Sequence, residues 1–253
     1  MSKLGFQLYS ARNYPPLSDV LSRLSKAGYA EVEGYSALYD HLDDNGVRAL
    51  RADLDRLGLT MPTSHFPLEM LEAAPEKVLL IAKILGIETI YCPYIVPEER
   101  PTDARGWFSF GARLQAAGQV IRDSGLDFGW HNHDFEFVRF DDGSTVLDQI
   151  FAGGPDLSWE ADIAWIIRGG GDPQHWIETY GHRISAVHVK DIAPAGENAD
   201  EDGWADVGHG TVGWDRLIPV LRATLARHFV VEHDNPSDLD RVIGRSIVAF
   251  NSY

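Results

Sequence analysis

Short runs of apolar, β-prone residues alternate along the chain with stretches whose apolar positions have helical spacing. Between two of these runs, Val47, Leu50, Leu54 and Leu57 recur three and four positions apart, as on one face of an amphipathic helix. We therefore expect a helix after each strand. The expected strands cover residues 4–9, 29–32, 59–63, 89–92, 126–130, 157–159, 184–189 and 229–231.

Glycines mark the ends of several expected helices, because glycine readily adopts the positive φ of a helix C-terminus. These glycines are Gly28, Gly58, Gly86 and Gly125. Later helices are expected at residues 144–151, 173–180, 214–225 and 238–250, with the glycine run 169–171 as a flexible turn. Strand–helix units at a pitch of roughly 30 residues predict an α/β fold, a single (β/α)8 TIM barrel of eight parallel strands over residues 1–253.

The main alternative fold is an open, doubly wound sheet. A sheet of this kind that binds a dinucleotide carries a glycine-rich phosphate loop after its first strand. Here that position holds Tyr9-Ser10-Ala11-Arg12-Asn13, which contains no glycine. The barrel is therefore favoured, and no linker rich in proline, serine or charge divides it into two domains.

Polar residues stand where the last four expected strands leave the core, and the active sites of such barrels lie at these carboxyl ends. Crowded carboxylates repel one another unless they are protonated or bridged by a cation, so a divalent metal is one interpretation. The other is that the acids pair with Lys190, Arg183 or amides at helix starts. The residues, in strand order, are Glu136, then Glu160 and Asp162, then His188 and Lys190, and finally Glu232.

Four segments in this order resemble the sugar phosphate isomerase/epimerase superfamily of xylose-isomerase-like barrels. They are residues 131–137 (HNHDFEF), 162–165 (DIAW), 188–191 (HVKD) and 232–234 (EHD), and the similarity covers essentially the whole chain. The resemblance implies one divalent metal ion, with Mn²⁺ expected before Co²⁺, Mg²⁺ or Zn²⁺. It also implies the metal ligands Glu136, Asp162, His188 and Glu232.

In this superfamily the two glutamates, here Glu136 and Glu232, also serve as acid and base. The implied reaction is isomerisation or epimerisation of a keto- or hydroxyketo-sugar through an enediolate. The alternative is a dehydratase, lyase or hydratase acting on an inosose or a 3-keto-glycoside. Abasic-site endonucleases also share the fold, and a barrel that binds sugar without catalysis is a further alternative.

Two departures place the chain nearest the inosose dehydratase and 3-keto-sugar members. Trp165 stands three residues after Asp162, where ketose 3-epimerases and the endonucleases place a histidine. Lys190 follows His188 at two residues, where the 3-epimerases carry an arginine further on. The missing histidine would remove a metal ligand from an endonuclease.

Alternation along a strand places Lys190 on the same side as His188. Lys190 is a candidate catalytic donor to an enolate or a leaving hydroxyl, or else a partner of Asp191 or Glu160. Substrate contact is expected for His65, His133, Trp165 and Glu160, with pairing to Lys190 or to loop carbonyls as the alternative. His131 is expected to pack more deeply or to orient ligands.

The amino-acid composition limits the kinds of partner and substrate that we expect the protein to bind. The formal net charge is -16, from 22 basic and 38 acidic residues, which disfavours nucleic acid. Residues 192–215 hold six acids and neither lysine nor arginine. We therefore expect this segment to be a solvated lid or a subunit contact. Because its negative charge would repel a phosphate group, we expect a neutral sugar or cyclitol as substrate. No run of about 18 apolar residues predicts a membrane span, and a cytoplasmic protein is expected. The superfamily's barrels often form homo-oligomers.

Overall fold

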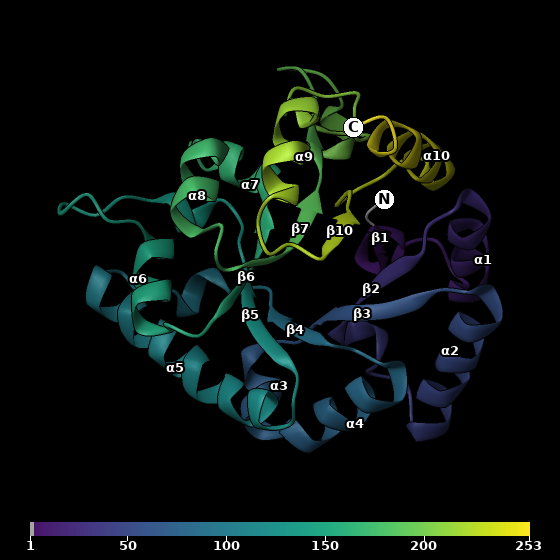
Figure 1. Cartoon of the computed structure of the whole chain (residues 1–253), viewed down its shortest axis with the longest axis horizontal. Helices are drawn as coiled ribbons and strands as arrows, with labels where there is room; N and C mark the ends of the chain where they lie inside the picture. The colour runs from purple at the N-terminus through teal and green to yellow at the C-terminus, as the bar shows by residue number, and fades with distance from the viewer. Residues whose placement is uncertain (1–2) are drawn as a thin grey trace.

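Eight parallel strands close a barrel in the computed structural model, which describes residues 3–253 (Figure 1). The first strand pairs with the last, with Gly5 opposite Val230, and this pairing closes the sheet. The predicted (β/α)8 barrel is therefore confirmed. Its strands are β1 (Leu4–Gln7), β2 (Glu31–Tyr35), β3 (Thr60–His65), β4 (Thr89–Cys92), β5 (Asp127–His131), β6 (Ser158–Asp162), β7 (Ile184–Val189) and β10 (His228–Val231).

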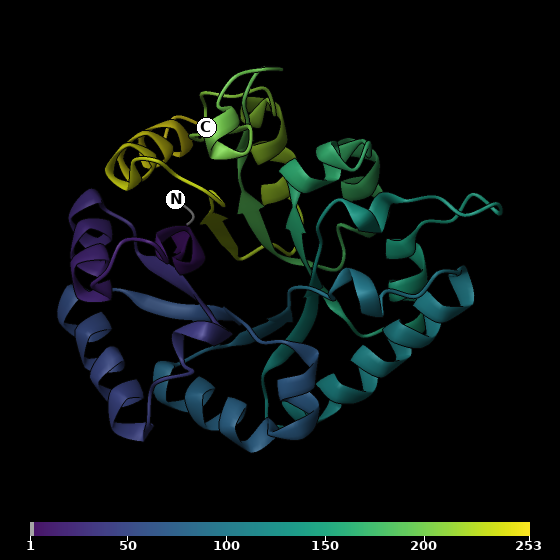
Figure 2. The same ribbon diagram turned by 180° about the vertical axis from the view of Figure 1, so that it is seen from behind.

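Helices surround the strands as an outer layer, which the view from behind also shows (Figure 2). Their apolar faces are buried against the sheet, as with Val47, Leu50 and Leu54 in the second helix. The helices are α1 (Leu17–Ala27), α2 (Asp44–Leu57), α3 (Leu68–Ala73), α4 (Pro75–Leu85), α5 (Ala104–Asp123), α6 (Val146–Gly153), α7 (Ile163–Arg168), α8 (Pro173–Tyr180), α9 (Trp214–Arg222) and α10 (Leu239–Phe250).

Sequence and structure agree on most element ends. Gly28, Gly58 and Gly86 cap their helices with φ of 99°, 70° and 78°, as the glycine pattern predicts. The helix expected from residue 144 begins at Val146, because Thr145 and Asp148 form a capping box there. None of the helices within residues 3–253 is both long and apolar enough to cross a membrane.

The chain after β5 turns away from the strand direction before it reaches Glu136. β5 ends at His131, and the turn is followed by a 3-10 helix, η4 (Phe135–Phe137). Side chains alternate between the two faces of a strand. His131 thus ends the barrel strand itself, whereas Glu136 belongs to a separate short helix.

The acidic segment after β7 is more ordered than a solvated lid. Its start and its middle pair as two short antiparallel strands, β8 (Asp191–Ile192) and β9 (Trp204–Ala205). Glu201 and Asp206 are buried, and both accept hydrogen bonds from Arg241 of α10, at 2.7 and 3.0 Å. The expectation of a solvated segment holds only for its other acids, Glu197, Asp200, Asp202 and Asp215, which are exposed.

Candidate metal centre

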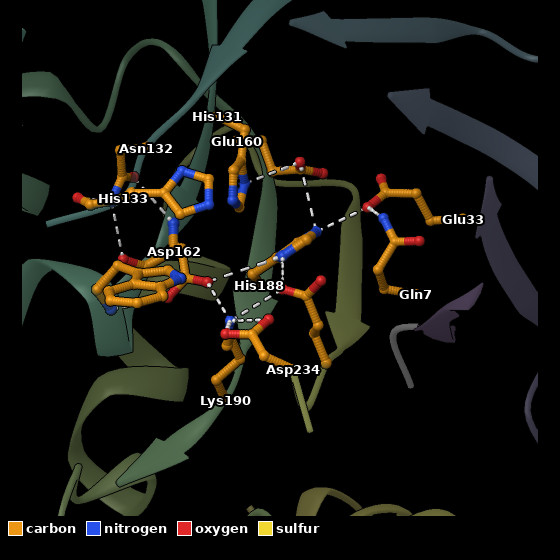
Figure 3. A network of polar contacts seen from close by, with 12 residues as sticks. Gln7, Glu33, His131, Asn132, His133, Glu160, Asp162, His188, Lys190 and Asp234 are labelled. Carbon is orange, nitrogen blue, oxygen red and sulfur yellow. Dashed lines mark hydrogen bonds and ion pairs between the residues drawn. The ribbon is translucent and has the colours of Figure 1, made fainter. Parts of the chain in front are cut away.

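Four buried side chains meet where β5, β6, β7 and β10 end, at the carboxyl end of the barrel (Figure 3). Each offers one ligand atom, and these four atoms lie within 4.8 Å of one another. Parallel pairing brings them together, since Asp162 is opposite His188 and Val230 is also opposite His188. The group consists of His131, Asp162, His188 and Glu232.

Local hydrogen bonds fix the orientation of Asp162. Its Oδ1 accepts from the backbone N–H of Trp165 at 2.9 Å and caps α7. Its own N–H donates to Oδ1 of Asn132 at 3.0 Å. Oδ2 is buried without a hydrogen-bond partner among the described residues, and it lies 3.8 Å from Nδ1 of His188. A buried oxygen of this kind is suited to a cation.

Glu136 lies outside this group, contrary to the ligand set implied by the resemblance. Its Oε1 accepts from the indole N–H of Trp130 at 2.9 Å, and its Oε2 accepts from the backbone N–H of His133 at 2.9 Å. Trp130 precedes His131 on β5 and therefore faces the other side of the strand. The structure brings Asp162, His188 and Glu232 together as expected, and His131 stands where Glu136 was expected.

A second group shares His131 and His188 and adds His65 from β3 and Glu160 from β6. Oε2 of Glu160 lies 2.5 Å from Nε2 of His65 and 3.1 Å from Nδ1 of His131. Glu160 thus contacts histidines, and it does not pair with Lys190 as one interpretation held. A cavity opens above these groups, and Glu160 is not among the described residues that line it.

Lys190 is almost completely buried among carboxylates. Its Nζ lies 2.7 Å from Oδ2 of Asp234, 3.1 Å from Oε2 of Glu232 and 3.6 Å from Oδ2 of Asp162. Burial lowers the pKa of Lys190, but these acids raise it further, so the net shift is upward and the amine stays an ammonium. Asp191, a suggested partner, accepts instead from backbone N–H groups of Gly208 and Val212.

Burial and neighbouring charges separate the pKa values of the acids. Burial raises the pKa of Asp162 to about 7, although Lys190 and His188 oppose the shift. For Glu232, burial also raises the pKa, but Lys190 and His188 lower it more, and the carboxyl is ionised. Burial raises the pKa of Glu136 to about 8, against the hydrogen bond from Trp130. Lys190 and His188 therefore do not fully offset the effect of burial on the pKa of Asp162.

The histidines differ in charge. Burial lowers the pKa of His65, but Glu33 and Glu160 raise it more, to about 10, so its ring is cationic. Burial, reinforced by Lys190, lowers the pKa of His133 to about 3, and this ring is neutral. The two rings therefore offer different hydrogen-bonding groups to a ligand.

A cavity of about 550 Å³ opens above the group. His65 and His133 line it, as expected for substrate contact, together with Tyr9, Tyr35, Tyr94 and Glu232. Trp165 is half-buried beside the cavity and packs between His133 and Trp204, with ring centroids 5.3 and 4.8 Å apart. Among the described residues, Trp165 is not one of those that line the cavity.

One residue of the site, Glu33, was missed in the sequence. Glu33 of β2 is fully buried, and its Oε1 lies 2.7 Å from Nε2 of His188 and accepts a hydrogen bond from Gln7 at 2.7 Å. The signal was present, because Glu31 and Glu33 flank Val32 within an otherwise buried strand. Alternation places both glutamates on one face.

Fold and site together define a (β/α)8 barrel protein with a candidate metal centre at the carboxyl ends of its strands. The sequence model of the xylose isomerase-like TIM barrel family matches residues 21–252, and the chain belongs to this family. The resemblance noted in the sequence is thereby confirmed. A comparison with curated protein sequences returns no significant match.

Similar solved structures show the same fold. A sugar phosphate isomerase/epimerase from Parabacteroides distasonis is 20% identical, with a TM-score of 0.77 over 98% of this chain and 92% of that one. The IolI protein with a bound zinc atom is 15% identical, with a TM-score of 0.76 over 99% and 97%. The probable 3-DHS dehydratase AsbF of Bacillus anthracis is also 15% identical, with a TM-score of 0.75 over 98% of both chains.

Proposed function

We propose that the chain is a divalent-metal-dependent enzyme that acts on a keto- or hydroxyketo-sugar through an enediolate. Isomerisation or epimerisation is the leading outcome. The observation that carries the proposal is the buried group of His131, Asp162, His188 and Glu232 beneath an aromatic cavity. Such a constellation at the carboxyl end of a barrel is typical of an active site.

The donor set fits a divalent cation. Two imidazole nitrogens and two carboxylate oxygens suit Zn²⁺, Co²⁺ and Mn²⁺, while Mg²⁺ prefers a shell of oxygens. Mn²⁺ stays our first expectation, and the second imidazole makes Zn²⁺ its main competitor. When bound, the cation would polarise the substrate carbonyl and stabilise the negative charge of the enediolate.

Two side chains are assigned catalytic roles. Glu232 faces the cavity and is ionised, so we assign it the removal of the proton next to the carbonyl carbon. Lys190 is a fixed ammonium 3.1 Å from that carboxylate, so we assign it the donation of a hydrogen bond to developing negative charge. Asp234 holds Lys190 in place through both carboxylate oxygens.

The position of Glu136 bears on which isomerisation is favoured. Its carboxylate binds Trp130 and the backbone of His133, and it is not among the described residues that line the cavity. Proton transfer between adjacent carbons on one face needs a single base, whereas epimerisation at one carbon needs a donor on each face. We therefore place an aldose–ketose type of transfer by Glu232 ahead of epimerisation.

Elimination of water from an inosose or a 3-keto-glycoside, or the reverse hydration, is the second candidate. It begins with the same proton removal and then requires a proton for the departing hydroxyl. The ammonium of Lys190 beside Glu232 favours this candidate, because it supplies a donor close to the base. Product analysis separates the two, since only elimination releases water and forms an unsaturated or dehydrated product.

The cavity favours a neutral substrate. Asp202, Glu232 and Asp234 line it, against the cationic side chains of Arg12 and His65, and His65 is already paired with Glu160. The Arg12 guanidinium already stacks on Tyr9 at 4.0 Å and donates to the backbone oxygen of Asp234 at 2.6 Å. A phosphate group would meet repulsion there, so we propose a neutral sugar or cyclitol. A cytoplasmic location and assembly as a homo-oligomer stay predictions.

Replacing Glu232 by glutamine tests the proposal. We expect E232Q to keep its fold and to lose at least about 100-fold in turnover of any substrate found, because the amide cannot accept the proton. Thermal unfolding would check the fold, and deuterium exchange at the substrate carbon would follow proton removal. Chelation should abolish turnover reversibly. Full activity after exhaustive metal removal would contradict the proposal.

A further inference from the structure

We propose that Glu33 and Glu160 are positioning residues that hold His188 and His131 with one ring nitrogen protonated and the other directed at the metal. The inference rests on the proposed metal-dependent function. It assigns a role to two carboxylates beside the histidines of the candidate centre (Figure 3), one of which, Glu160, was expected to contact substrate.

The contacts of His188 are divided between its two nitrogens. Nδ1 lies 3.0 Å from Oε2 of Glu232 and 3.8 Å from Oδ2 of Asp162, within the candidate metal group. Nε2 lies 2.7 Å from Oε1 of Glu33, on the opposite side of the ring. Gln7 donates to the same oxygen at 2.7 Å and steadies that carboxylate. Glu33 thus keeps a proton at Nε2 and leaves Nδ1 as the ligand atom.

His131 also has a carboxylate beside one ring nitrogen, with the nitrogens exchanged, but no hydrogen bond joins them in the structure. Its Nδ1 lies 3.1 Å from Oε2 of Glu160, so the other nitrogen, Nε2, is the one left for the metal group. The contact is looser than that of His188, because Nδ1 is not aligned for a hydrogen bond. We therefore expect Glu160 to contribute less than Glu33 to the orientation of its histidine.

His65 allows the two carboxylates to lie close together. Its Nε2 is 3.2 Å from Oε1 of Glu33 and 2.5 Å from Oε2 of Glu160. Its ring stacks on that of His188, with centroids 5.5 Å apart and an angle of 17° between planes. A single ring nitrogen of His65 is thus shared between one oxygen of each acid, which holds the two carboxylates in place beside His188.

A second metal bound by His65, Glu160, His131 and His188 is the alternative use of these residues. With both centres filled, His131 and His188 would each need to ligate through both nitrogens. Each ring would then have lost both protons, whereas histidine ordinarily ligates as a neutral imidazole. The carboxylates beside these rings favour retention of the protons.

Metal titration of variants tests the inference. In E33A we expect affinity for Zn²⁺ or Mn²⁺ to fall about 10- to 100-fold, as is usual when the partner of a ligand histidine is lost. E33Q keeps an acceptor oxygen and should lose less, and E160A should also lose less than E33A. The matched control is E31A, which removes a buried glutamate of the same strand that pairs with His228 at 2.8 Å. Equal affinity in E33A and E31A would overturn the inference.

Nitrogen-15 NMR of labelled histidines in the unaltered, metal-free protein gives a second test that needs no variant. We expect a proton on Nε2 of His188 and on Nδ1 of His131, and we expect both to persist after metal is added. Loss of these protons with two metals bound per chain would overturn the inference in favour of the second centre. Absence of any divalent metal binding would refute the proposed function, whereas the proton positions would still decide the hydrogen-bonding assignment.

Discussion

His131 and Glu136 are close in the sequence, yet only His131 projects from the end of a barrel strand into the candidate centre. Its backbone is opposite Glu160 of β6, which places the ring beside the strands that carry Asp162 and His188. Glu136 is held in η4 by Trp130 and His133. The ligand assignment thus depends on one turn after β5.

Replacing His131 or Glu136 by a residue that cannot bind metal distinguishes between the two ligand assignments. We expect H131A to weaken affinity for Zn²⁺ or Mn²⁺ by more than about 100-fold, because it removes one of four donors, a larger loss than removing a partner of a ligand. E136Q should leave that affinity within about twofold of the original, since Glu136 lies outside the group. Competition with a chelator of known affinity would measure both. The reverse order of effects would restore Glu136 as the ligand.

The positions of three of the expected ligands could be predicted from the sequence because they lie on, or directly after, readable strands. Asp162 ends β6, His188 lies within β7, and Glu232 follows β10. The position of Glu136 could not be predicted, because hydrophobic periodicity does not show how a chain turns once a strand has ended. Alternation from the apolar Trp130 was the signal that favoured His131.

At the scale of elements, α5 and α6 approach closely through glycines. A Cβ at Gly111 of α5 would lie 2.2 Å from the backbone oxygen of Ile150 of α6, a contact that real Cβ atoms do not make. The two helices could therefore be predicted from their periodicity, but their close approach could not. Backbone proximity depends on both helices at once and leaves no pattern in either sequence.

Adding a methyl group at two glycines tests this packing. We expect G111A to lower the free energy of unfolding by about 1–3 kcal/mol, because the helices must separate to fit the methyl group. The control is G244A in α10, where a Cβ would meet no atom within 4 Å. Alanine there should raise stability by about 0.5–1 kcal/mol through its higher helix propensity. Urea denaturation measures both, and equal effects would contradict the packing.

The segment after β7 is tied to α10 through buried acids. Burial raises the pKa of Glu201, but hydrogen bonds from Arg241 and Ser237 lower it more, to about 2. An acid whose pKa is lowered by folding stabilises the fold above its unfolded pKa of about 4.3. That contribution is lost as the pH falls through about 2.

E201Q should therefore lower the free energy of unfolding by about 1–3 kcal/mol at pH 7, since it removes a charged hydrogen-bond partner of Arg241. The difference from the original protein should shrink between about pH 4 and pH 2. The control is D240N, which removes only an exposed pair with Arg23 at 3.4 Å and should change stability by less than about 0.5 kcal/mol. A constant effect of E201Q at all pH values would contradict the assignment.

At the scale of the whole molecule, the barrel could be predicted because its evidence is repeated along the chain. Alternating strand and helix patterns admit few topologies, and parallel connections make consecutive strands neighbours. The short helices α3 and α7 and the pair β8–β9 were not predicted, because six-residue and two-residue elements carry little periodicity.

Closure of the barrel brings charged side chains from distant strands together in its interior. Glu33 from β2 reaches His188 from β7 only because the sheet closes through β1 and β10. Glu160 and His65 meet across the same interior at 2.5 Å. Polar residues from distant strands thus form one buried cluster, and fold and candidate centre depend on one another.

Anomalous scattering from crystals grown with Mn²⁺ or Zn²⁺ tests the central claim most directly. We predict one strong peak about 2.0–2.2 Å from ligand atoms of His131, Asp162, His188 and Glu232. Glu136 should keep its hydrogen bonds to Trp130 and His133. The absence of a peak at this group, or a peak that includes Glu136 in place of His131, would contradict the account.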